Sequence, residues 1–390
     1  MQLFIGLMSG TSLDGVDGVL LQIVPLSLLN TPSLKVLQHV FQPFDPQFRA
    51  ELLSLNTPGN NELHRAALAG NCLARNYAQV VHALLKTSGK QAHDIQAIGA
   101  HGQTVRHRPL EFDADPKTGQ PAVGYTLQLN NPALLAELTG IDVVAEFRTR
   151  DLAAGGQGAP LVPAFHAEIF SKPSHTVAVV NIGGISNISV LRNASRTHSA
   201  APEPVAITGF DCGPGNALMD HWIHLHQGKD YDANGEWAAQ GQIIPALLQS
   251  LLAEPFLHQA PPKSTGRDLF NPAWLQQHLR ADYQAADVQA TLCEFTAMAI
   301  AQDLIRHAPE AQQLWVCGGG ALNGRLMSRL QAHAPGVQVA STEAHGLPPL
   351  QVEAAAFAWL AAKAMKRETG SLESVTGARG ARVLGAIYPR

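Results

Sequence analysis

The same arrangement of residues occurs twice in this chain: an apolar segment, a short loop of small polar residues, and a second apolar segment. The first copy covers residues 3–24 and the second covers residues 177–191. Each copy predicts a β-hairpin, because short apolar runs on both sides of turn residues favour paired strands. The repetition predicts two related domains, residues 1–175 and 176–390, each beginning with a hairpin whose turn faces a shared cleft.

Apolar strands and helices alternate along the rest of the sequence. The chain has 390 residues, of which 46% are hydrophobic and 15% are charged, so it can bury a core large enough for two domains. We expect strands at 95–100, 143–145, 205–208 and 314–317, and helices within 46–88, at 160–170, at 217–226, at 287–307 and at 354–364. This alternation predicts an α/β fold with mixed sheets.

The net charge and the cysteines limit the partners of the chain. A net charge of −4 gives no basic surface for nucleic acid or for an anionic membrane. No apolar run reaches the roughly 18 residues that a membrane-spanning helix needs, and the first residues lack the features of a signal peptide. The four cysteines form no close pair, which argues against a zinc knuckle or a disulfide framework. We therefore expect a cytoplasmic protein that binds a small molecule.

The first hairpin loop has the composition of a phosphate-binding loop but lacks the lysine of the Walker type. Its glycines allow successive N–H groups to converge on a phosphate, and its hydroxyls add donors. Its two carboxylates would repel a bare phosphate but tolerate one that carries a magnesium ion. The candidate residues are Gly10, Thr11, Ser12, Leu13, Asp14, Gly15, Val16 and Asp17. The alternative is an ordinary hairpin turn.

Two further glycine-rich turns also follow apolar strands. A run of glycines removes side chains where a flat ligand or its phosphates can lie against the backbone. The spacing of a Rossmann dinucleotide site is absent. The candidate residues in these turns are Gly183, Gly184, Gly318, Gly319, Gly320 and Asn323. The three turns together predict a nucleotide in a cleft.

The loop over residues 209–216 contains a single carboxylate, Asp211, directly after an expected strand. An acid that is held at a strand end beside a cleft is well placed to act as a general base. In the alternative interpretation Asp211 only stabilises its own turn. We also expect Asn216 to cap the helix that begins at Ala217.

Other charged residues have two interpretations each. Arg148 and Arg150 stand beside Asp151 and can clamp a carboxylate or a phosphate, or else form a salt-bridged turn. Glu353, near the start of an apolar helix, suits the helix dipole at least as well as a ligand contact.

Histidines and a polar cluster complete the set of candidates. Of His221, His224 and His226, only the first two share a helical face, so solvated or core histidines are favoured over a zinc site. Residues 263–267 form a polar cluster in an irregular stretch, for which a flexible surface loop is the simplest interpretation.

Seven motifs, in this order, resemble those of the anhydro-N-acetylmuramic acid kinase family, and the resemblance covers residues 3–389. The motifs lie at residues 6–17, 100–104, 147–160, 181–184, 209–216, 263–267 and 317–323. The resemblance implies a two-domain, actin-like ATPase fold of ribonuclease H-like domains, with an interdomain cleft for MgATP and sugar. It implies ATP and Mg²⁺ as cofactors and 1,6-anhydro-N-acetylmuramic acid as substrate, without nucleic acid or membrane as a partner. A homodimer is one assembly compatible with it.

The family pattern also assigns roles to the candidate residues. Residues 10–17 correspond to the first phosphate loop, residues 183–184 lie in the second, and residues 318–323 meet the adenosine end. Asp211 matches the catalytic aspartate of the family. For the sugar or its lactyl carboxylate, we expect contacts from His101, Gln103, Arg148 and Glu353.

The resemblance implies that one active site opens the 1,6-anhydro ring with water and phosphorylates the freed O6, which yields N-acetylmuramate 6-phosphate and ADP. Asp211 would take a proton from the water that attacks C1. One alternative is a conventional sugar kinase of the same fold, in which Asp211 deprotonates a hydroxyl of the substrate. Another is a nucleotide-switched binding protein, for which we expect a separate peptide-binding segment that the sequence does not contain.

Overall fold

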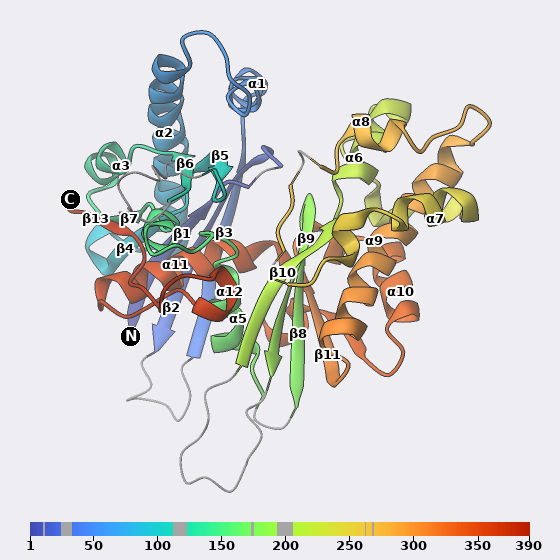
Figure 1. Cartoon of the computed structure of the whole chain (residues 1–390). Helices are drawn as coiled ribbons and strands as arrows, with labels where there is room; N and C mark the ends of the chain where they lie inside the picture. The colour runs from blue at the N-terminus through green and yellow to red at the C-terminus, as the bar shows by residue number, and fades with distance from the viewer. Residues whose placement is uncertain are drawn as a thin grey trace, which may run out of the picture. The chain divides into compact units, whose positions relative to one another are not determined.

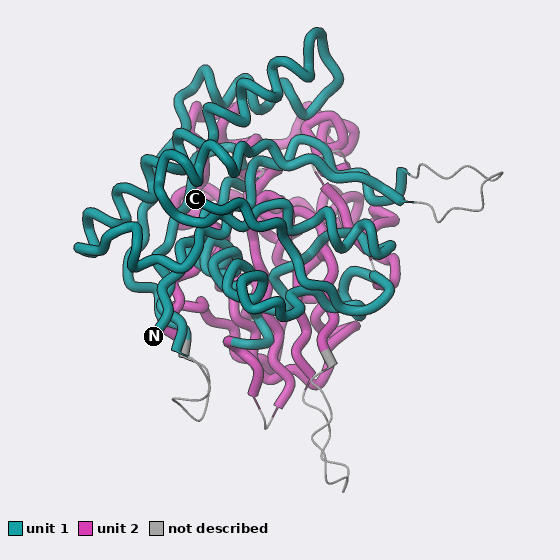
Figure 2. The backbone as a smooth tube through the Cα atoms, turned by 90° about the vertical axis from the view of Figure 1, so that its left-hand side faces the viewer, with its two compact units in different colours: residues 1–168, 351–390 teal, residues 169–350 magenta. Residues whose placement is uncertain are grey.

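The computed structural model describes residues 1–10, 12–24, 33–111, 123–172, 175–192, 206–261, 263–266 and 269–390. Contacts within the chain divide it into two compact units (Figure 2). The first unit contains residues 1–168 and 351–390, and the second contains residues 169–350. The sequence predicts a single boundary between residues 175 and 176; the structure instead places residues 351–390 in the first unit.

The first unit is built on a six-stranded mixed sheet with the order β13-β7-β4-β1-β2-β3 (Figure 1). Its strands are β1 (Gln2–Met8), β2 (Gly15–Val24), β3 (Ser33–Pro43), β4 (Ile95–Ala100), β7 (Val143–Ala145) and β13 (Ala386–Tyr388). β1, β2 and β3 form an antiparallel meander, which confirms the first predicted hairpin. β4 pairs with β1, and β7 pairs with β4, both in parallel.

The second unit is built on a five-stranded mixed sheet with the order β10-β9-β8-β11-β12. Its strands are β8 (Thr176–Ile182), β9 (Ile185–Arg192), β10 (Ala206–Pro214), β11 (Ala311–Cys317) and β12 (Gln338–Ser341). The first three strands again form a meander, and β11 and β12 are added in parallel beside β8. Both units therefore share one topology, as the repeated hairpins predict, and it is that of the actin-like, ribonuclease H-like ATPase fold that the resemblance implies.

Helix α11 (Val352–Met365) joins the C-terminal part of the chain to the first unit. It lies across β1 and β4 (Figure 1). Gly6 on β1 and Gly99 on β4 leave room for its backbone, because a Cβ atom at either position would overlap a carbonyl oxygen of the helix. β13 then pairs with β7. This long-range packing explains why residues 351–390 belong to the first unit although they follow the second unit in the sequence.

The remaining elements of the first half of the chain flank the first sheet. They are α1 (Pro46–Ser54), α2 (Glu62–Ser88), α3 (Pro132–Thr139), α4 (Thr149–Ala153), α5 (Val162–Phe170), and the two-stranded sheet of β5 (Gln103–Arg108) and β6 (Tyr125–Leu129). The helical region expected over residues 46–88 is two helices, because Pro58 and Gly59 interrupt it. The buried face of α2, which includes Leu73, Tyr77 and Val81, packs into the core of this unit. A short helix, α12 (Glu373–Thr376), lies in the C-terminal segment.

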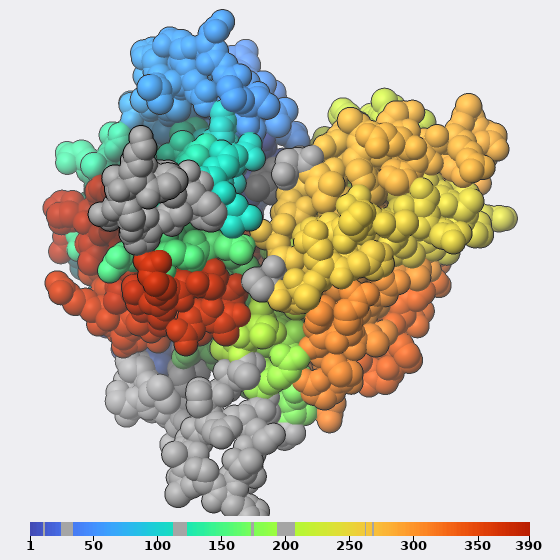
Figure 3. Space-filling model, in the orientation of Figure 1, coloured from blue at the N-terminus to red at the C-terminus, as the bar shows by residue number. Residues whose placement is uncertain are grey.

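Helix α9 (Ala285–His307) is the central helix of the second unit, and it confirms the helix expected at 287–307. It is buried along most of its length and contacts β9, β10 and the other helices. Those helices are α6 (Ala217–Gln227), α7 (Pro245–Leu252), α8 (Pro272–Gln276) and α10 (Gly324–His333). The segments from α7 to α10 give this unit the yellow and orange surface seen in Figure 3. Among the residues that the structure describes, no helix is long and apolar enough to span a membrane.

Candidate active site

The loop between β1 and β2 forms a tight turn that presents polar groups at the end of the first sheet. The N–H of Leu13 donates to the carbonyl oxygen of Gly10 at 3.2 Å, and Leu13 has a left-handed φ of 58°. The hydroxyl of Ser12 donates to Oδ1 of the exposed Asp14 at 2.7 Å. Thr11 lies outside the described residues. A hydroxyl and a carboxylate are thus side by side on this loop.

The remaining residues of the predicted phosphate loop belong to strand β2 or to the core of the first unit. Gly15, Val16 and Asp17 belong to β2 and not to the loop. Leu13 and Val16 are buried in the core of the first unit, so only their backbone groups are available to a ligand. Oδ1 of Asp17 lies 2.9 Å from Nε2 of His39 on β3. Burial raises the pKa of Asp17, and His39 opposes that shift.

A buried ring of hydrogen bonds connects this loop to the end of β4. Ser9 donates its hydroxyl to the carbonyl oxygen of Gly102 at 3.2 Å, and the N–H of Gly102 donates to the hydroxyl oxygen of Tyr77 at 3.1 Å. The Tyr77 hydroxyl therefore donates to Ser9 across their 3.0 Å contact. Nε2 of Gln103 donates to the carbonyl oxygen of Gly10 at 3.0 Å. Hydrogen bonds thus join the predicted sugar motif to the predicted phosphate loop.

His101 and Arg148 are brought together in the first unit, as their shared predicted role requires. Nε and Nη2 of Arg148 lie 3.1 and 3.0 Å from Nε2 of His101. Because arginine can only donate, Nε2 is the acceptor, and the protonated Nδ1 donates to the carbonyl oxygen of Gly102 at 2.6 Å. Burial and the neighbouring Arg148 hold the pKa of His101 well below its usual value, so the ring is neutral. Nη1 of Arg148 donates to the carbonyl oxygen of Gly158 at 2.7 Å.

Two buried histidines predict a loss of stability at acid pH. Burial lowers the pKa of His101, and it lowers that of His166 on α5 to about 3. The pKa of each histidine in the folded protein is below the unfolded value of about 6.5. Its contribution to folding stability is therefore complete above about pH 6.5, and it is lost as the pH falls toward the folded pKa. Each histidine should reduce the free energy of unfolding by at most about 2 kcal/mol between pH 7 and pH 5. Urea unfolding of the wild type and of His101→Gln measures this: the variant should lose less stability, and an equal loss contradicts the assignment.

Asp151 acts as a structural anchor for the glycine-rich turn that follows α4. Its side chain is fully buried; Oδ2 accepts from the N–H of Gly158 at 2.8 Å and Oδ1 accepts from the hydroxyl of Thr376 at 2.9 Å. These contacts fix the backbone of Gly158, whose carbonyl oxygen in turn holds Arg148. Glu353 lies in the first turn of α11, where it suits the helix dipole.

In the second unit, the turn of the second hairpin is bound to the loop that follows Asp211. The N–H groups of Gly215 and Ala217 donate to the carbonyl oxygen of Gly184, and that of Asn216 donates to Gly183 at 2.7 Å. Helix α6 begins at Ala217 as expected, but the predicted side-chain cap is wrong. The amide of Asn216 instead donates to the carbonyl oxygen of Ile182 at 3.1 Å, because the hairpin lies within its reach.

Asp211 lies within β10 and not in a loop after a strand, which corrects the expected strand end at residue 208. It is paired with Asn187 of β9, and the register shifts immediately after it. The N–H of Thr265 donates to Oδ2 of Asp211 at 2.8 Å, and the N–H of Asp211 donates to the carbonyl oxygen of Lys263 at 3.0 Å. The half-buried carboxylate is therefore held by a segment remote in sequence.

The prediction of a flexible surface loop over residues 263–267 is wrong for Lys263. Its side chain is fully buried, and Nζ lies 2.8 Å from Oδ2 of Asp303 on α9. The rings of Phe210 and Phe256 lie beside the ammonium group, at 5.7 and 5.1 Å from their centroids. Burial raises the pKa of Asp303, and Lys263 opposes that shift. Arg267, the last residue of this motif, lies outside the described residues.

The glycine turn after β11 has the predicted position between a strand and a helix. Gly318 has a φ of 78°, which favours glycine, and a Cβ atom there would overlap Oδ1 of Asn181. Residues 319–322 form a short 3₁₀ turn. Oδ1 of Asn323 then caps α10 by accepting from the N–H of Leu326 at 3.0 Å. The glycines of this turn present backbone at the end of β11, and Leu322 in the same turn is exposed.

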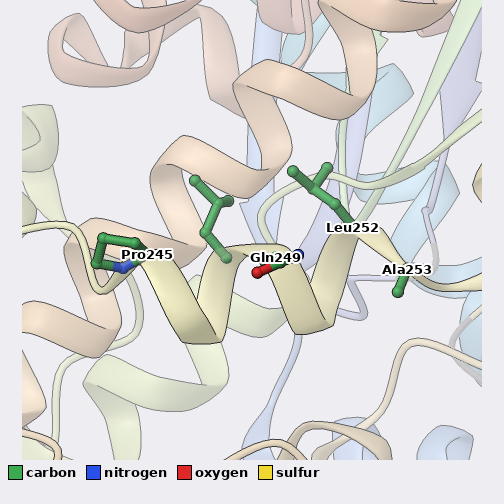
Figure 4. A pocket seen from close by; sticks show the side chains of 5 residues that line it. Pro245, Gln249, Leu252 and Ala253 are labelled. Carbon is green, nitrogen blue, oxygen red and sulfur yellow. The ribbon is translucent and has the colours of Figure 1, made fainter.

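The histidines and a surface hollow of the second unit lie apart from the predicted site residues. His226 packs on the ring of Trp222 at 4.1 Å, and no three His, Cys, Asp or Glu side chains are grouped for a metal in the part of the chain that the structure describes. A hollow of about 450 Å³ lies on α7 (Figure 4). It is lined by Pro245, Leu248, Gln249, Leu252 and Ala253, none of which is a predicted site residue.

Comparison with known proteins identifies relatives along the whole chain. A sequence model of the anhydro-N-acetylmuramic acid kinase family matches residues 2–390. The anhydro-N-acetylmuramic acid kinase of Variovorax paradoxus (strain S110) is 62% identical over 390 residues, which cover 100% of this chain and 99% of that protein. The protein of the same name from Albidiferax ferrireducens is 56% identical over 399 residues, with 99% of each chain covered. The xylulose kinase structure from Rhodospirillum rubrum has a TM-score of 0.44 and 14% identity, covering 93% of this chain and 90% of that one.

Proposed function

Because the chain belongs to the anhydro-N-acetylmuramic acid kinase family, we infer that it opens the ring of 1,6-anhydro-N-acetylmuramic acid with water and phosphorylates the freed O6 with ATP. The products are N-acetylmuramate 6-phosphate and ADP. In the structure, the observation that supports this proposal most directly is Asp211, a half-buried carboxylate whose Oδ2 is fixed by the N–H of Thr265.

The proposed chemistry assigns one proton transfer to Asp211. Its carboxylate takes a proton from the water whose oxygen bonds to C1, while the bond between C1 and O6 breaks. The departing O6 attacks the γ-phosphorus of ATP, and ADP leaves. The leaving group of the hydrolysis is thus the nucleophile of the phosphoryl transfer. The hydrogen bond from the N–H of Thr265 to Oδ2 holds the carboxylate in place for this transfer.

We propose that the two hairpin turns bind the phosphates of ATP. Residues 10–14 would contribute N–H groups and the Ser12 hydroxyl, and Gly183 and Gly184 would contribute backbone groups. The exposed Asp14 fits Mg²⁺, which binds proteins through one or two carboxylates together with the phosphates of its nucleotide. When bound, Mg²⁺ neutralises charge on the phosphates. Asp17 fits this role less well, since its Oδ1 already contacts His39.

We propose that the turn over residues 318–323 contacts the adenosine part of ATP. Its glycines expose backbone, and Leu322 is an exposed apolar side chain within the same turn. The side-chain oxygen of Asn323 already accepts the hydrogen bond that caps α10. We therefore propose that this oxygen affects nucleotide binding by fixing the turn, and not by contacting the nucleotide.

We propose that the group of His101, Gln103 and Arg148 binds the sugar. We propose Glu353 as a further residue of the sugar site. Oε1 of Gln103 is buried and has no hydrogen-bond partner among the residues that the structure describes, which supports contact with a substrate hydroxyl or amide. Arg148, half-buried and oriented by His101 and Gly158, supports recognition of the lactyl carboxylate.

Replacing Arg148 by Lys should weaken binding of the sugar selectively. A charged hydrogen bond to a carboxylate contributes roughly 1.5–3 kcal/mol, so we expect KM for the sugar to rise about 10- to 100-fold while KM for ATP stays within about twofold. Steady-state kinetics with each substrate varied in turn measures this. Arg150→Lys, an exposed arginine two residues away, is the matched control and should behave as the wild type. Equal changes in both KM values for Arg148→Lys would remove Arg148 from the sugar site.

The proposed function is tested by supplying purified protein and MgATP with 1,6-anhydro-N-acetylmuramic acid or with reducing N-acetylmuramic acid, and measuring ADP and product mass. We expect ADP only with the anhydro sugar, and a product heavier by one water and one phosphoryl group. Turnover of the reducing sugar alone would indicate a conventional sugar kinase, and ATP-dependent protein capture without turnover would indicate a nucleotide-switched binding protein. We place the reaction in the cytoplasm because it consumes ATP. A homodimer remains a prediction that light scattering tests.

A further inference from the structure

Asp211 is held on two sides by one short stretch of backbone. The carbonyl oxygen of Lys263 accepts from the N–H of Asp211, and two residues later the N–H of Thr265 donates to the Asp211 carboxylate. Described residues 263–266 have no helix or strand of their own. The position of the carboxylate therefore depends on whatever fixes this stretch.

The side chain of Lys263 is the main anchor of that stretch. Its ammonium group pairs with Asp303 at 2.8 Å and also lies 3.4 Å from the carbonyl oxygen of Leu257. The exposed fraction of the Lys263 side chain is 0%, and that of Asp303 is 2%. Because Asp303 lies on the long, largely buried helix α9, the ion pair connects the irregular stretch to the core of the unit.

The neighbours of Asp211 in β10 face the same ion pair. Alternate residues of a strand point to opposite faces, so Phe210 and Cys212 point inward when Asp211 points outward. The Phe210 ring lies beside the ammonium group of Lys263, and both Phe210 and Cys212 are buried. The ion pair thus lies beneath the strand position that carries the carboxylate.

A gain in folding stability alone does not explain the presence of the Lys263–Asp303 ion pair. Replacing a buried ion pair by apolar side chains of similar volume is often neutral or stabilising, whereas removing one partner leaves an uncompensated charge. In some proteins, buried polar or ionic groups serve instead to fix one conformation.

We propose that the Lys263–Asp303 ion pair is a positioning device for the base: it fixes residues 263–265 so that the N–H of Thr265 orients the Asp211 carboxylate. Lys263 and Asp303 are positioning residues and do not touch the substrate. This inference rests on the proposed function, in which Asp211 is the base.

The test uses Lys263→Met, which keeps an unbranched side chain and removes the charge, and Asp303→Asn, which keeps the volume and an acceptor oxygen. Misplacement of a catalytic group costs up to about 100-fold in rate, so we expect kcat to fall about 10- to 100-fold for Lys263→Met, and by less for Asp303→Asn. KM values for ATP and sugar should stay within about twofold, because neither binding group is altered. Lys263→Arg, which retains the charge, should recover most of the rate.

Arg329→Met is the control for loss of another ion pair on α9. Arg329 pairs with the buried Glu294, roughly 13 Å along the helix from Asp303. Because Arg329 is 29% exposed and His333 also contacts Glu294 at 2.7 Å, we expect a smaller fall of Tm than for Lys263→Met, with kcat within about twofold of the wild type. A comparable fall of kcat in this control would show that the rate follows general stability, and would overturn the proposal.

A double variant separates this proposal from the proposed function. If Lys263 acts through Asp211, then Lys263→Met added to Asp211→Asn should not lower the residual rate further. If the fold-changes in kcat of the two single variants multiply fully in the double variant, the positioning role is wrong. If Lys263→Met and Asp303→Asn both keep wild-type kcat while Asp211→Asn is inactive, the positioning role is wrong and the proposed function stands. If Lys263→Met does not fold, Asp303→Asn alone tests the proposal: a lower kcat supports it, and a wild-type kcat overturns it.

Discussion

Asp211→Asn should lower kcat by about 10²- to 10⁴-fold while leaving the fold and nucleotide binding intact. The amide has the size of the carboxylate, and its oxygen can still accept from the N–H of Thr265, so the local geometry is preserved. An amide cannot take the proton of the attacking water. Removal of a general base costs typically 10²- to 10⁴-fold in rate, and we expect kcat to fall within about that range.

Three measurements check this expectation: kcat on the anhydro sugar, ATP affinity by calorimetry, and Tm. ATP affinity and Tm should match the wild type. Asp230→Asn is the matched control, since Asp230 is an exposed aspartate of the same unit. Activity of Asp211→Asn within about threefold of the wild type would exclude Asp211 as the base.

Gly215→Val should separate the second hairpin from the strand that carries Asp211. A Cβ atom at Gly215 would collide with the carbonyl oxygen of Gly183, and its own N–H donates to Gly184 at 2.9 Å. Overpacking of this kind costs about 1–3 kcal/mol of stability. Because it displaces both the turn that we propose binds phosphate and the strand that carries Asp211, we expect kcat/KM for ATP to fall by about 100-fold or more.

The matched control for that substitution is Gly59→Val. Gly59 is exposed in a turn of the first unit and has only a flexible arginine side chain nearby. The control should keep wild-type kinetics and Tm within about 2 °C. If Gly215→Val were as active as this control, then contact between the hairpin turn and the loop after Asp211 would not matter for the reaction.

The parts of the fold that depend on local patterns could be predicted from the sequence. Both hairpins, the helix at 287–307 and the glycine turn at 318–320 follow from residue periodicity and turn composition, and the structure contains them. Residues 351–390 could not be assigned correctly, because their place depends on close packing of α11 against Gly6 and Gly99, which are remote in sequence.

The surroundings of Asp211 could not be predicted from the sequence. The strand was expected to end at residue 208, and a bulged strand reaching Pro214 has no clear local signal. The environment of Lys263 depends on an ion pair with a residue 40 positions away. One signal could have revealed it: Asp303 interrupts an otherwise apolar helical face between Ile300 and Leu304, and a carboxylate there needs a partner.

The roles of the residues in the first unit depend on contacts that no single motif encodes. His101 and Arg148 were each candidates for sugar binding, but the sequence does not show that one orients the other. The structure also separates residues that share one motif: Asp14 is exposed on the loop, whereas Asp17 lies in β2 beside His39. Neighbouring positions of one motif can therefore lie in different environments.

The central claim, that water opens the anhydro ring in the same active site that phosphorylates O6, is tested most directly in ¹⁸O-labelled water. Wild-type enzyme is given MgATP and 1,6-anhydro-N-acetylmuramic acid, and the product is analysed by mass spectrometry at early times. Unlabelled product incubated equally long in the same water corrects for spontaneous exchange at C1. We predict one ¹⁸O atom at C1 and none in the phosphoryl group. A product without label at C1, or with label in the phosphoryl group, would contradict the account.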